Sequence, residues 1–354
     1  MGKVPKTLLI FGGIDDAHVR FVARRLRVLG VRCLFYDAVR ALPVHFPITP
    51  VIGMAFNSGT ITTEEIIDDE GCEKINKVIV AFYDDIEWIW IRHKKFVDLI
   101  NTKEDQWLYV SSKENEALFR SLIIAYDAKS FNSLDAIFRM RSKINQIVIA
   151  MSVGFSVPET IISSNKEMIE EFMSVYRNII VKPLSINFVP PPADGSDTFM
   201  TILTNEVKKE DFELFSDLEF SAAPSIYQRK LDKAYEVRLV AFGDECVAYK
   251  IDSQRSRRGQ LDWRRAQYEA IYEQMEPTSE MHEKACAFLE RSGLHYGVFD
   301  LVVDRCDRLW FLECNSDGQW AWLEPAGNGP IVQMFARQIA RLMGVSEKER
   351  CSAF

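Results

Sequence analysis

Residues 297–320 read GVFDLVVDRCDRLWFLECNSDGQW. Two apolar runs flank the polar segment 304–308, which is the pattern of an antiparallel β-hairpin. With a turn of two or four residues, Asp300 lies opposite Glu313, whereas a slip of one residue would move it to the other face. Asn315 shares the face of Glu313, because residues i and i+2 of a strand point the same way. We therefore predict that three oxygen donors converge at one end of this hairpin.

Carboxylate and amide oxygens are ligands for hard cations such as Mg²⁺, which typically binds one or two carboxylates plus substrate phosphates. The hairpin therefore predicts a magnesium site formed by Asp300, Glu313 and Asn315. The alternative interpretation of the hairpin alone is a pair of strands whose acidic residues lie at a solvated end.

Composition bounds the class of protein. The chain has 354 residues, enough for two or three domains, and its 47% hydrophobic and 27% charged residues are typical of globular proteins. The formal net charge of −8 argues against a nucleic-acid partner, and no apolar run is long enough to cross a membrane. Seven scattered cysteines without a CxxC pair argue against a disulfide framework or a zinc site. These features favour a reducing, cytoplasmic location.

The N-terminal region predicts an α/β domain. A strand at 7–11 precedes an amphipathic helix at 15–30, which Gly30 ends, and a second strand follows at 31–37. This order is typical of a right-handed parallel unit. Further along, 77–84 is expected to be a strand and 112–128 a helix.

A junction at 129–133 leads into the next region. The expected elements there are a helix over 134–154, a strand over 157–164, a helix over 165–176 with Asn165 as its N-cap, and a strand over 178–184. A Pro/Gly-rich loop follows at 185–197, and loops of this length are usually functional. Helices are also expected over 281–293 and 332–344.

Two lysines lie where an anion could meet them. Lys143 is in the helical pattern, and Lys182 ends a β-branched strand before Pro183. A lysine beside an apolar strand needs an anion or must reach out to solvent, and for each lysine alone the solvated alternative stays open. The chain has neither a GxxxxGK[ST] nor a GxGxxG pattern, so a P-loop is excluded.

The segment 224–265 carries further candidates. YQRKL (227–231) is expected to be an extended linker strand whose backbone N–H and C=O groups can read a purine edge. A hairpin around Gly243 and Asp244 follows, with Glu236 and Arg238 on one face of its first strand. SQRSRRGQLDWRR (253–265) holds five arginines, which suit recognition of phosphate or of an acidic substrate. A solvated charged loop and an RNA-contacting patch are the alternatives.

Taken together, these motifs resemble those of the ATP-grasp superfamily and, more narrowly, of the microviridin-type ligases that macrocyclise ribosomal peptides (graspetide, or omega-ester peptide, synthetases). The narrower resemblance rests on IWIRHKK (89–95), SKINQIVIAMSVGFSVPETIISSN (142–165), DSQRSRRGQLDWR (252–264) and FLECNSDGQWAWLE (311–324). It covers most of the chain, and the D-W-R and E-x-N-x-x-G-Q-W elements are its specific parts.

The resemblance implies a fold, an activity and roles for matching residues. The fold is α/β, with a Rossmann-like N-terminal (pre-ATP-grasp) domain at 1–128, a central lid domain at 129–227, a C-terminal α+β domain at 228–346 and a tail at 347–354. The implied activity is an ATP- and Mg²⁺-dependent ligase that activates Asp or Glu side chains of a precursor peptide as acyl-phosphates and forms ester or amide crosslinks. The implied partners are that peptide, with its leader and acidic core, and a second copy of the chain in a homodimer.

By the same resemblance, Lys143 and Lys182 hold the ATP phosphates, and Asp300, Glu313 and Asn315 bind magnesium. Gln228, Arg229 and Leu231 belong to the hinge that reads adenine, and Glu236 lies at the ribose. Arg238 and Arg264 stabilise the transferring phosphoryl group and the acyl-phosphate.

The chain departs from its relatives at two places. Asn315-Ser316 stands where Asn-Pro is usual, and Arg229-Lys230 stands where an acidic residue followed by an aromatic one is common. Because of the second departure, the resemblance implies backbone contacts to adenine but no side-chain contact to its amino group.

Three other functions compete with this interpretation. The first is a ligase of the glutamate-ligase type acting on a small amino acid or a protein terminus; Trp320, Trp322 and the D-W-R element favour the peptide ligase over it. The second is an ATP-binding regulator without turnover, which need not keep all these lysines, arginines and acids. The third is an RNA-binding module at 255–265, which the net charge disfavours.

Overall fold

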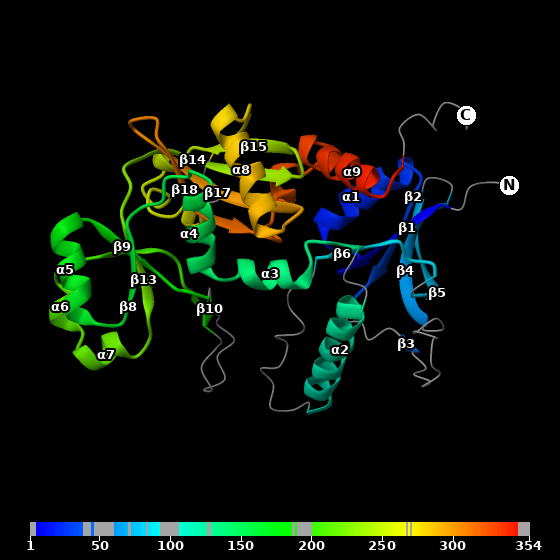
Figure 1. Ribbon diagram of the computed structural model, residues 1–354, viewed down its shortest axis with the longest axis horizontal. Helices are drawn as coiled ribbons and strands as arrows, with labels where there is room; N and C mark the ends of the chain where they lie inside the picture. The colour runs from blue at the N-terminus through cyan, green and yellow to red at the C-terminus, as the bar shows by residue number, and fades with distance from the viewer. Residues whose placement is uncertain are drawn as a thin grey trace.

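The computed structural model describes residues 5–37, 44–45, 60–69, 72–82, 84–92, 106–125, 129–185, 188–189, 200–266, 268–269 and 271–345. Within these ranges the main elements form three sheets with helices between and around them (Figure 1).

The first sheet is the α/β unit expected near the N-terminus. Its strand order is β3-β4-β2-β1-β6-β7, with β5 paired to β4. The bounds are β1 Lys6–Phe11, β2 Val31–Tyr36, β3 Val44–His45, β4 Thr60–Asp69, β5 Cys72–Ala81, β6 Trp88–Ile91 and β7 Ser130–Phe131. β1 is parallel to both β2 and β6, which confirms the parallel unit. The strand expected at 77–84 is the second half of β5, which begins earlier, at Cys72, and pairs antiparallel with β4 in a long hairpin.

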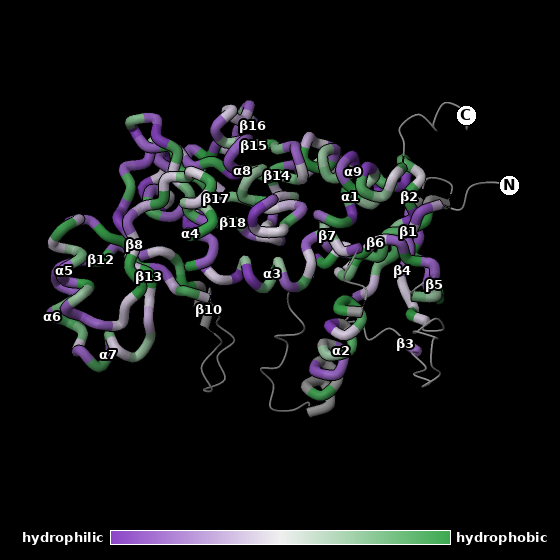
Figure 2. The backbone as a smooth tube through the Cα atoms, in the orientation of Figure 1, coloured by the Kyte–Doolittle hydropathy of each residue, from purple (hydrophilic) through white to green (hydrophobic). Residues whose placement is uncertain are grey.

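Helix α1, Ala17–Val28, connects β1 to β2 and confirms the expected helix. Asp16 caps it by accepting a hydrogen bond from the backbone N–H of His18, and Gly30 follows it with a φ of +77°. In Figure 1, α1 lies beside α9, Pro330–Leu342, so the first and last helices of the described chain pack together. Hydrophobic and hydrophilic positions alternate along α9 in Figure 2, as an amphipathic helix requires. A further helix, α2, spans Gln106–Ala125.

The single helix expected over 134–154 is wrong. The chain forms two helices, α3 at Leu134–Met140 and α4 at Lys143–Ser152. The break occurs because the Ser142 side chain accepts a hydrogen bond from the Asn145 N–H and begins a new helix. Lys143 is therefore the first residue of α4, facing the C-terminal sheet, rather than a residue in the middle of a long helix.

The second sheet has the strand order β12-β9-β13-β8, with bounds Asn205–Val207, Ile179–Lys182, Ser225–Arg229 and Thr160–Ser163. Helices α5 (Lys166–Tyr176), α6 (Asp211–Leu214) and α7 (Asp217–Ser221) lie beside it (Figure 1). Asn165 caps α5 through the Met168 N–H, as expected. Strand β13 contains the first part of YQRKL, which confirms an extended strand there, and it pairs on both sides, with β8 and β9.

The loop expected at 185–197 lies largely outside the described residues. Its described part includes a short strand, β10 (Phe188–Val189), which pairs with β11 (Met200–Thr201). Lys182, the last residue of β9, precedes this segment.

The third sheet is antiparallel, with the order β16-β15-β14-β17-β18. The bounds are β14 Lys233–Phe242, β15 Glu245–Ile251, β16 Tyr272–Met275, β17 Tyr296–Asp304 and β18 Leu309–Asn315. One face packs against α3, α4 and α8 (Ser279–Ser292) through residues such as Leu239, Phe299 and Phe311. The other face packs against α9 through Val240, Phe242 and Val298. Burial on both faces fixes which side chains reach the end of the sheet where the candidate site lies.

Candidate active site

Asp300 and Glu313 are cross-strand partners on β17 and β18, as predicted. The predicted turn length is wrong, because five residues separate the paired Val303 and Leu309. That turn alone would pair Asp300 with Leu312. A β-bulge between Asp300 and Leu301, with Leu312 as the extra residue of β18, moves the pairing by one residue and places Glu313 opposite Asp300.

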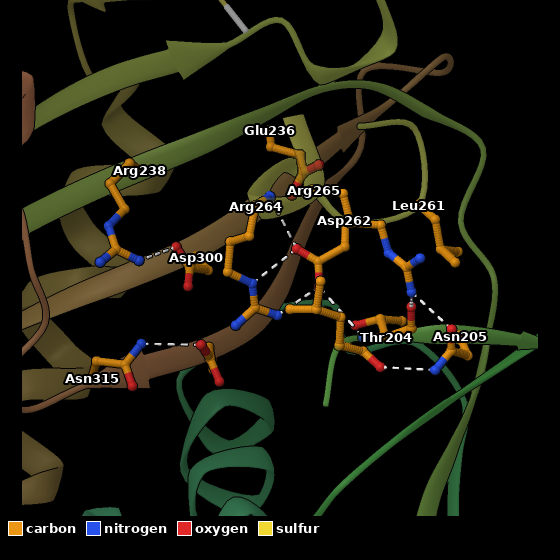
Figure 3. Close-up of polar contacts among 12 residues, drawn as sticks. Thr204, Asn205, Glu236, Arg238, Leu261, Asp262, Arg264, Arg265, Asp300 and Asn315 are labelled. Carbon is orange, nitrogen blue, oxygen red and sulfur yellow. Dashed lines mark hydrogen bonds and ion pairs between the residues drawn. The ribbon is translucent and has the colours of Figure 1, made fainter. Parts of the chain in front are cut away.

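Glu313 is held by two neighbours. Lys143 Nζ, from the first turn of α4, forms an ion pair with Glu313 Oε2, and Asn315 Nδ2 donates to Glu313 Oε1 at 3.0 Å. Burial opposes the ionised form, yet the Lys143 charge and these hydrogen bonds hold the pKa of Glu313 well below its usual range. With its nitrogen on Glu313, the Asn315 amide directs its oxygen elsewhere (Figure 3).

Asp300 is in a different electrostatic state. Burial and the neighbouring Glu313 charge raise the pKa of Asp300 to about 6, although Arg238 opposes this. Arg238 Nη1 donates to Asp300 Oδ1 at 2.5 Å, and its Nη2 donates to the Gln319 carbonyl at 2.7 Å (Figure 3). Arg238 Nε is buried without a hydrogen-bond partner in the described part of the chain. Two carboxylates thus lie side by side, with the Asn315 amide next to them.

Lys182 and Arg264 complete the cationic side of the site. Burial lowers the pKa of Lys182 to about 8, against the attraction of Glu313. Arg264 is fixed by Asp262, which accepts from its Nε at 2.8 Å and its Nη2 at 2.7 Å (Figure 3). Asp262 is 5% exposed and was missed as a site residue, although its place in the D-W-R element was the available signal.

Neighbouring contacts tie the D-W-R segment to the second sheet. The Thr204 N–H lies 3.4 Å from Asp262 Oδ2, and Arg265 Nη2 donates to the Thr204 carbonyl at 2.6 Å and to Asn205 Oδ1 at 2.7 Å. Figure 3 shows these contacts beside Arg264. Arg255, Arg257 and Arg258 are exposed and, like Arg265, do not line the cavities described below, so of the five arginines in this segment the structure brings only Arg264 to the carboxylates.

A first cavity lies between the second and third sheets. Apolar side chains of Ile180, Leu231, Val302 and Leu312 line it together with Lys182, Gln228, Glu236 and both carboxylates. Two apolar walls with polar groups at one edge fit a flat heterocycle that continues into a charged group. Lys143 and Lys182 also line an adjoining cavity with Glu313 and Asn315.

The hinge side of this cavity is ordered by hydrogen bonds. Gln228 Nε2 donates to Thr160 Oγ1 at 2.8 Å, and the Thr160 hydroxyl donates to the Pro158 carbonyl at 2.7 Å. This chain fixes the amide orientation and leaves Gln228 Oε1 buried, without a partner among the described residues. Arg229 instead pairs with Glu159 and lies over the Trp310 ring, at 4.9 Å from its centroid.

Glu236 lines the same cavity. It accepts from Lys233 Nζ at 3.0 Å, and Lys233 also donates to the Leu261 carbonyl at 3.0 Å. Glu236 and Arg238 point to the same side of β14, as the alternation predicted.

A second cleft opens on the other side of the carboxylates. It encloses about 760 Å³ and is lined by Arg238, Arg264, Asp300, Glu313 and Asn315 on one side. Aromatic rings form the other side: Trp263 and Trp322 lie 5.3 Å apart, and Tyr272 and Trp322 4.7 Å apart, between ring centroids. Of the two tryptophans that favour a peptide ligase, only Trp322 lines this cleft, whereas Trp320 is buried against His18. Tyr272 was not identified from the sequence.

Comparisons with known proteins identify the fold. No family model matches the sequence, and no curated protein does. Solved structures match over nearly the whole chain. A RiPP-associated ATP-grasp ligase from Chryseobacterium gregarium, in complex with ADP and a leader and core peptide, gives a TM-score of 0.77 at 21% identity, covering 96% of this chain and 97% of that one.

Two further solved structures match the fold of this chain. Macrocyclase MdnC from Microcystis aeruginosa, bound with precursor peptide MdnA, gives a TM-score of 0.76 at 20% identity, covering 95% of this chain and 99% of that one. The ATP-grasp ligase PsnB, complexed with a precursor variant, Mg and ADP, gives 0.68 at 19% identity over 96% and 99%. The chain therefore has the ATP-grasp ligase fold, as the sequence motifs implied. Among the described residues, no helix combines the length and apolar character that crossing a bilayer requires.

Proposed function

We propose that this chain is an ATP-dependent ligase of the graspetide type. It activates Asp or Glu side chains of a ribosomally made precursor peptide as acyl-phosphates and joins them to hydroxyl or amino groups of the same peptide. The observation that carries the proposal is the position of Asp300 and Glu313, which line both the first cavity and the open second cleft, with Asn315 beside them in the second cleft. Fold neighbours described with ADP and with precursor peptides support it.

The first cavity is the proposed ATP site. The hinge at Gln228, Arg229 and Leu231 holds the adenine, Glu236 lies at the ribose, and Lys143 and Lys182 hold the phosphates. The proposed units are an N-terminal domain at 1–128, a lid at 129–227, a C-terminal domain at 228–346 and a tail at 347–354. Phosphates bound between the lid and the C-terminal domain would lie directly beside the carboxylate pair.

The donor set fits Mg²⁺. Two carboxylates and an amide oxygen on one hairpin are hard ligands, and they leave further positions for phosphate oxygens. Bound there, the metal supplies charge neutralisation across the phosphates during transfer. Lys143, which pairs with Glu313 in the structure, would then be free to turn toward the phosphates. Arg238 Nη1 would be released from Asp300 toward the substrate, while its Nη2 stays on the Gln319 carbonyl.

The remaining chemistry needs positioning and positive charge. A substrate carboxylate oxygen attacks the γ-phosphorus of ATP, the bond to the β-phosphate oxygen breaks, and ADP leaves with an acyl-phosphate formed. Arg238, Arg264 and Lys182 meet the charge that develops in this step. A hydroxyl or amine then attacks the acyl carbon, loses its proton, and displaces inorganic phosphate to leave an ester or an amide.

The second cleft favours a peptide over a free amino acid. Its volume of about 760 Å³ greatly exceeds the needs of one amino acid, and its ring wall offers apolar contact beyond the reacting groups. Tyr268 on the same wall is 95% exposed and adds contact area for a long substrate.

The proposed partners follow from the same likeness. They are a precursor peptide with a leader and an acidic core, and a second copy of the chain in a homodimer. We propose a cytoplasmic location and no nucleic-acid or membrane partner, in line with the net charge of −8 and the scattered cysteines.

Mass spectrometry of an acidic precursor peptide incubated with the protein, ATP and Mg²⁺ tests the proposal. We expect loss of one water mass for each new bond, together with ADP release, and fragmentation then locates the linked residues. An unchanged peptide mass with ADP release stimulated by free amino acids would instead establish a small-substrate ligase. Nucleotide binding without either product would identify a non-catalytic regulator.

A further inference from the structure

The turn at 316–320, which follows the proposed metal ligand Asn315, is held by side chains from the N-terminal part of the chain. Asn132, at the end of β7, is fully buried, and its Nδ2 donates to the Ser316 carbonyl at 2.8 Å. The same side chain donates to the Tyr296 carbonyl and accepts from the backbone N–H groups of His295 and Tyr296. The first residue of the turn is therefore fixed to the junction that precedes α3.

Arg92 fixes the middle of the turn. It directly follows β6 and is 7% exposed. Its Nη1 donates to the Asp317 carbonyl at 2.7 Å, pairs with the Asp317 carboxylate, and lies 3.4 Å from the Gly318 carbonyl. Its Nε donates to Asp16 Oδ2 at 2.9 Å. A planar guanidinium with several acceptors allows little rotation of the groups that it binds.

His18 fixes the end of the turn. The Trp320 N–H donates to His18 Nε2 at 2.9 Å, so the ring proton lies on Nδ1, which faces Asp16 Oδ1 at 2.6 Å. Asp16 thus supports both His18 and Arg92, and α1 and β6 act on the turn together.

The remaining carbonyl of the turn, that of Gln319, accepts from Arg238 Nη2 at 2.7 Å. Arg238 in turn contacts Asp300. We propose that Arg92 is a positioning residue for Arg238: it holds the turn at 316–320 so that the Gln319 carbonyl orients the guanidinium over the carboxylates. The catalytic part of this inference rests on the function proposed above.

A purely structural role explains these contacts less well. The same two parts of the chain are already joined by a buried hydrogen bond from Trp90 Nε1 to Tyr296 Oη at 2.9 Å and by apolar packing around Phe335. A buried charge is costly to desolvate, and apolar packing joins two surfaces at lower cost. What the Arg92 charge adds is orientation of two consecutive residues of the turn, Asp317 and Gly318, beside the site.

The first test measures the turn itself. Arg92→Gln is compared with Tyr296→Phe, which removes the buried Trp90 hydrogen bond between the same parts of the chain but none of the hydrogen bonds to residues 316–320 described above. By hydrogen exchange of the full-length protein with ADP and Mg²⁺, we expect peptides covering 316–323 to exchange about tenfold faster in Arg92→Gln and unchanged in Tyr296→Phe. A crystal structure of Arg92→Gln should show the Gln319–Arg238 contact broken. Unchanged exchange at 316–323 overturns the inference.

The second test measures whether Arg92 acts through Arg238. Active sites are counted by ADP titration, and the rate of peptide condensation is measured for Arg92→Gln, Arg238→Lys and the double variant. Positioning predicts a fall of about tenfold in kcat for Arg92→Gln in the wild-type background, but less than about twofold in the Arg238→Lys background. Arg92→Lys, which can still donate to a turn carbonyl, should recover part of the rate.

The outcomes distinguish failure of the positioning role of Arg92 from failure of the proposed ligase function. Fully additive effects of Arg92→Gln and Arg238→Lys show a structural role and overturn the inference. If the wild-type protein condenses no acidic peptide, the proposed function fails, and the contact between turn and Arg238 is judged by exchange and the crystal structure.

Discussion

Asp300 and Glu313 face each other across β17 and β18 only because the ladder shifts by one residue at Leu312. Residues 301–303 pair with 311–309, and that register would place Asp300 opposite Leu312. Glu313 would then share the face of the fully buried Phe311. The bulge therefore turns Glu313 from the core to the face of Asp300 and turns Leu312 into the wall of the first cavity.

Glu313→Gln is expected to abolish ADP formation while the fold stays intact. The amide keeps the size of the side chain but removes the charge that would bind magnesium and that now pairs with Lys143. Loss of one such stabilising group costs about 10²–10³ in rate. ADP release under saturating ATP, Mg²⁺ and peptide measures the effect, with the exposed Glu290→Gln as control. Wild-type turnover in Glu313→Gln would refute the metal assignment.

Those features of this site that depend on neighbouring residues can be predicted from the sequence. Period-2 alternation on β14, the strand-ending Lys182 and the cap at Asn165 are all visible in short windows. The break at Ser142 is less visible, because a serine in a periodic segment is compatible with one helix or two. The contact of Arg92 with Asp317 leaves no local signal at all, since it spans 225 positions and depends on how two sheets pack.

Gln228 is expected to favour adenine over guanine. Its Oε1 is a buried acceptor held in place by the Thr160 hydroxyl, so it matches the amino group of adenine and opposes the carbonyl of guanine. One such hydrogen bond is worth about 0.5–1.5 kcal/mol, so Gln228→Leu should reduce the preference for ADP over GDP by about threefold to tenfold. Isothermal titration with both nucleotides measures this ratio. Thr160→Val, which frees the amide, should give a smaller loss in the same direction, and an unchanged ratio in Gln228→Leu would exclude the contact.

Nucleotide affinity is expected to fall as the pH rises above about 8. Burial lowers the pKa of Lys182 to about 8, so the free protein loses this positive charge at higher pH, whereas bound phosphates favour the protonated form. The dissociation constant of ADP, measured between pH 7 and 9.5, should therefore rise by at most about tenfold per pH unit above the pKa. Lys182→Arg keeps its charge over this range and should flatten the profile. The same slope in Lys182→Arg would show that another group is responsible.

Stability is expected to fall on acidification below pH 6.5, in part through His18. Burial lowers the pKa of His18 in the folded protein, and its Nε2 must stay unprotonated to accept the Trp320 N–H. Below the unfolded value of about 6.5 the unfolded chain takes up a proton that the folded chain does not, so the stability present above 6.5 is lost as the pH falls. Burial would raise the pKa of Asp16, but its pairing with His18 and Arg92 lowers that pKa in the folded protein. Asp16 therefore adds a further loss of stability at lower pH.

Urea unfolding at pH 7.5, 6.5 and 5.5 measures this dependence. One proton contributes at most about 1.4 kcal/mol per pH unit to the free energy of unfolding. His18→Asn should be less stable at pH 7.5 but should show a shallower slope, and the slope that remains includes His295, whose pKa burial also lowers. A variant slope equal to that of the wild type would mean that His18 is not the group that senses acid at this interface.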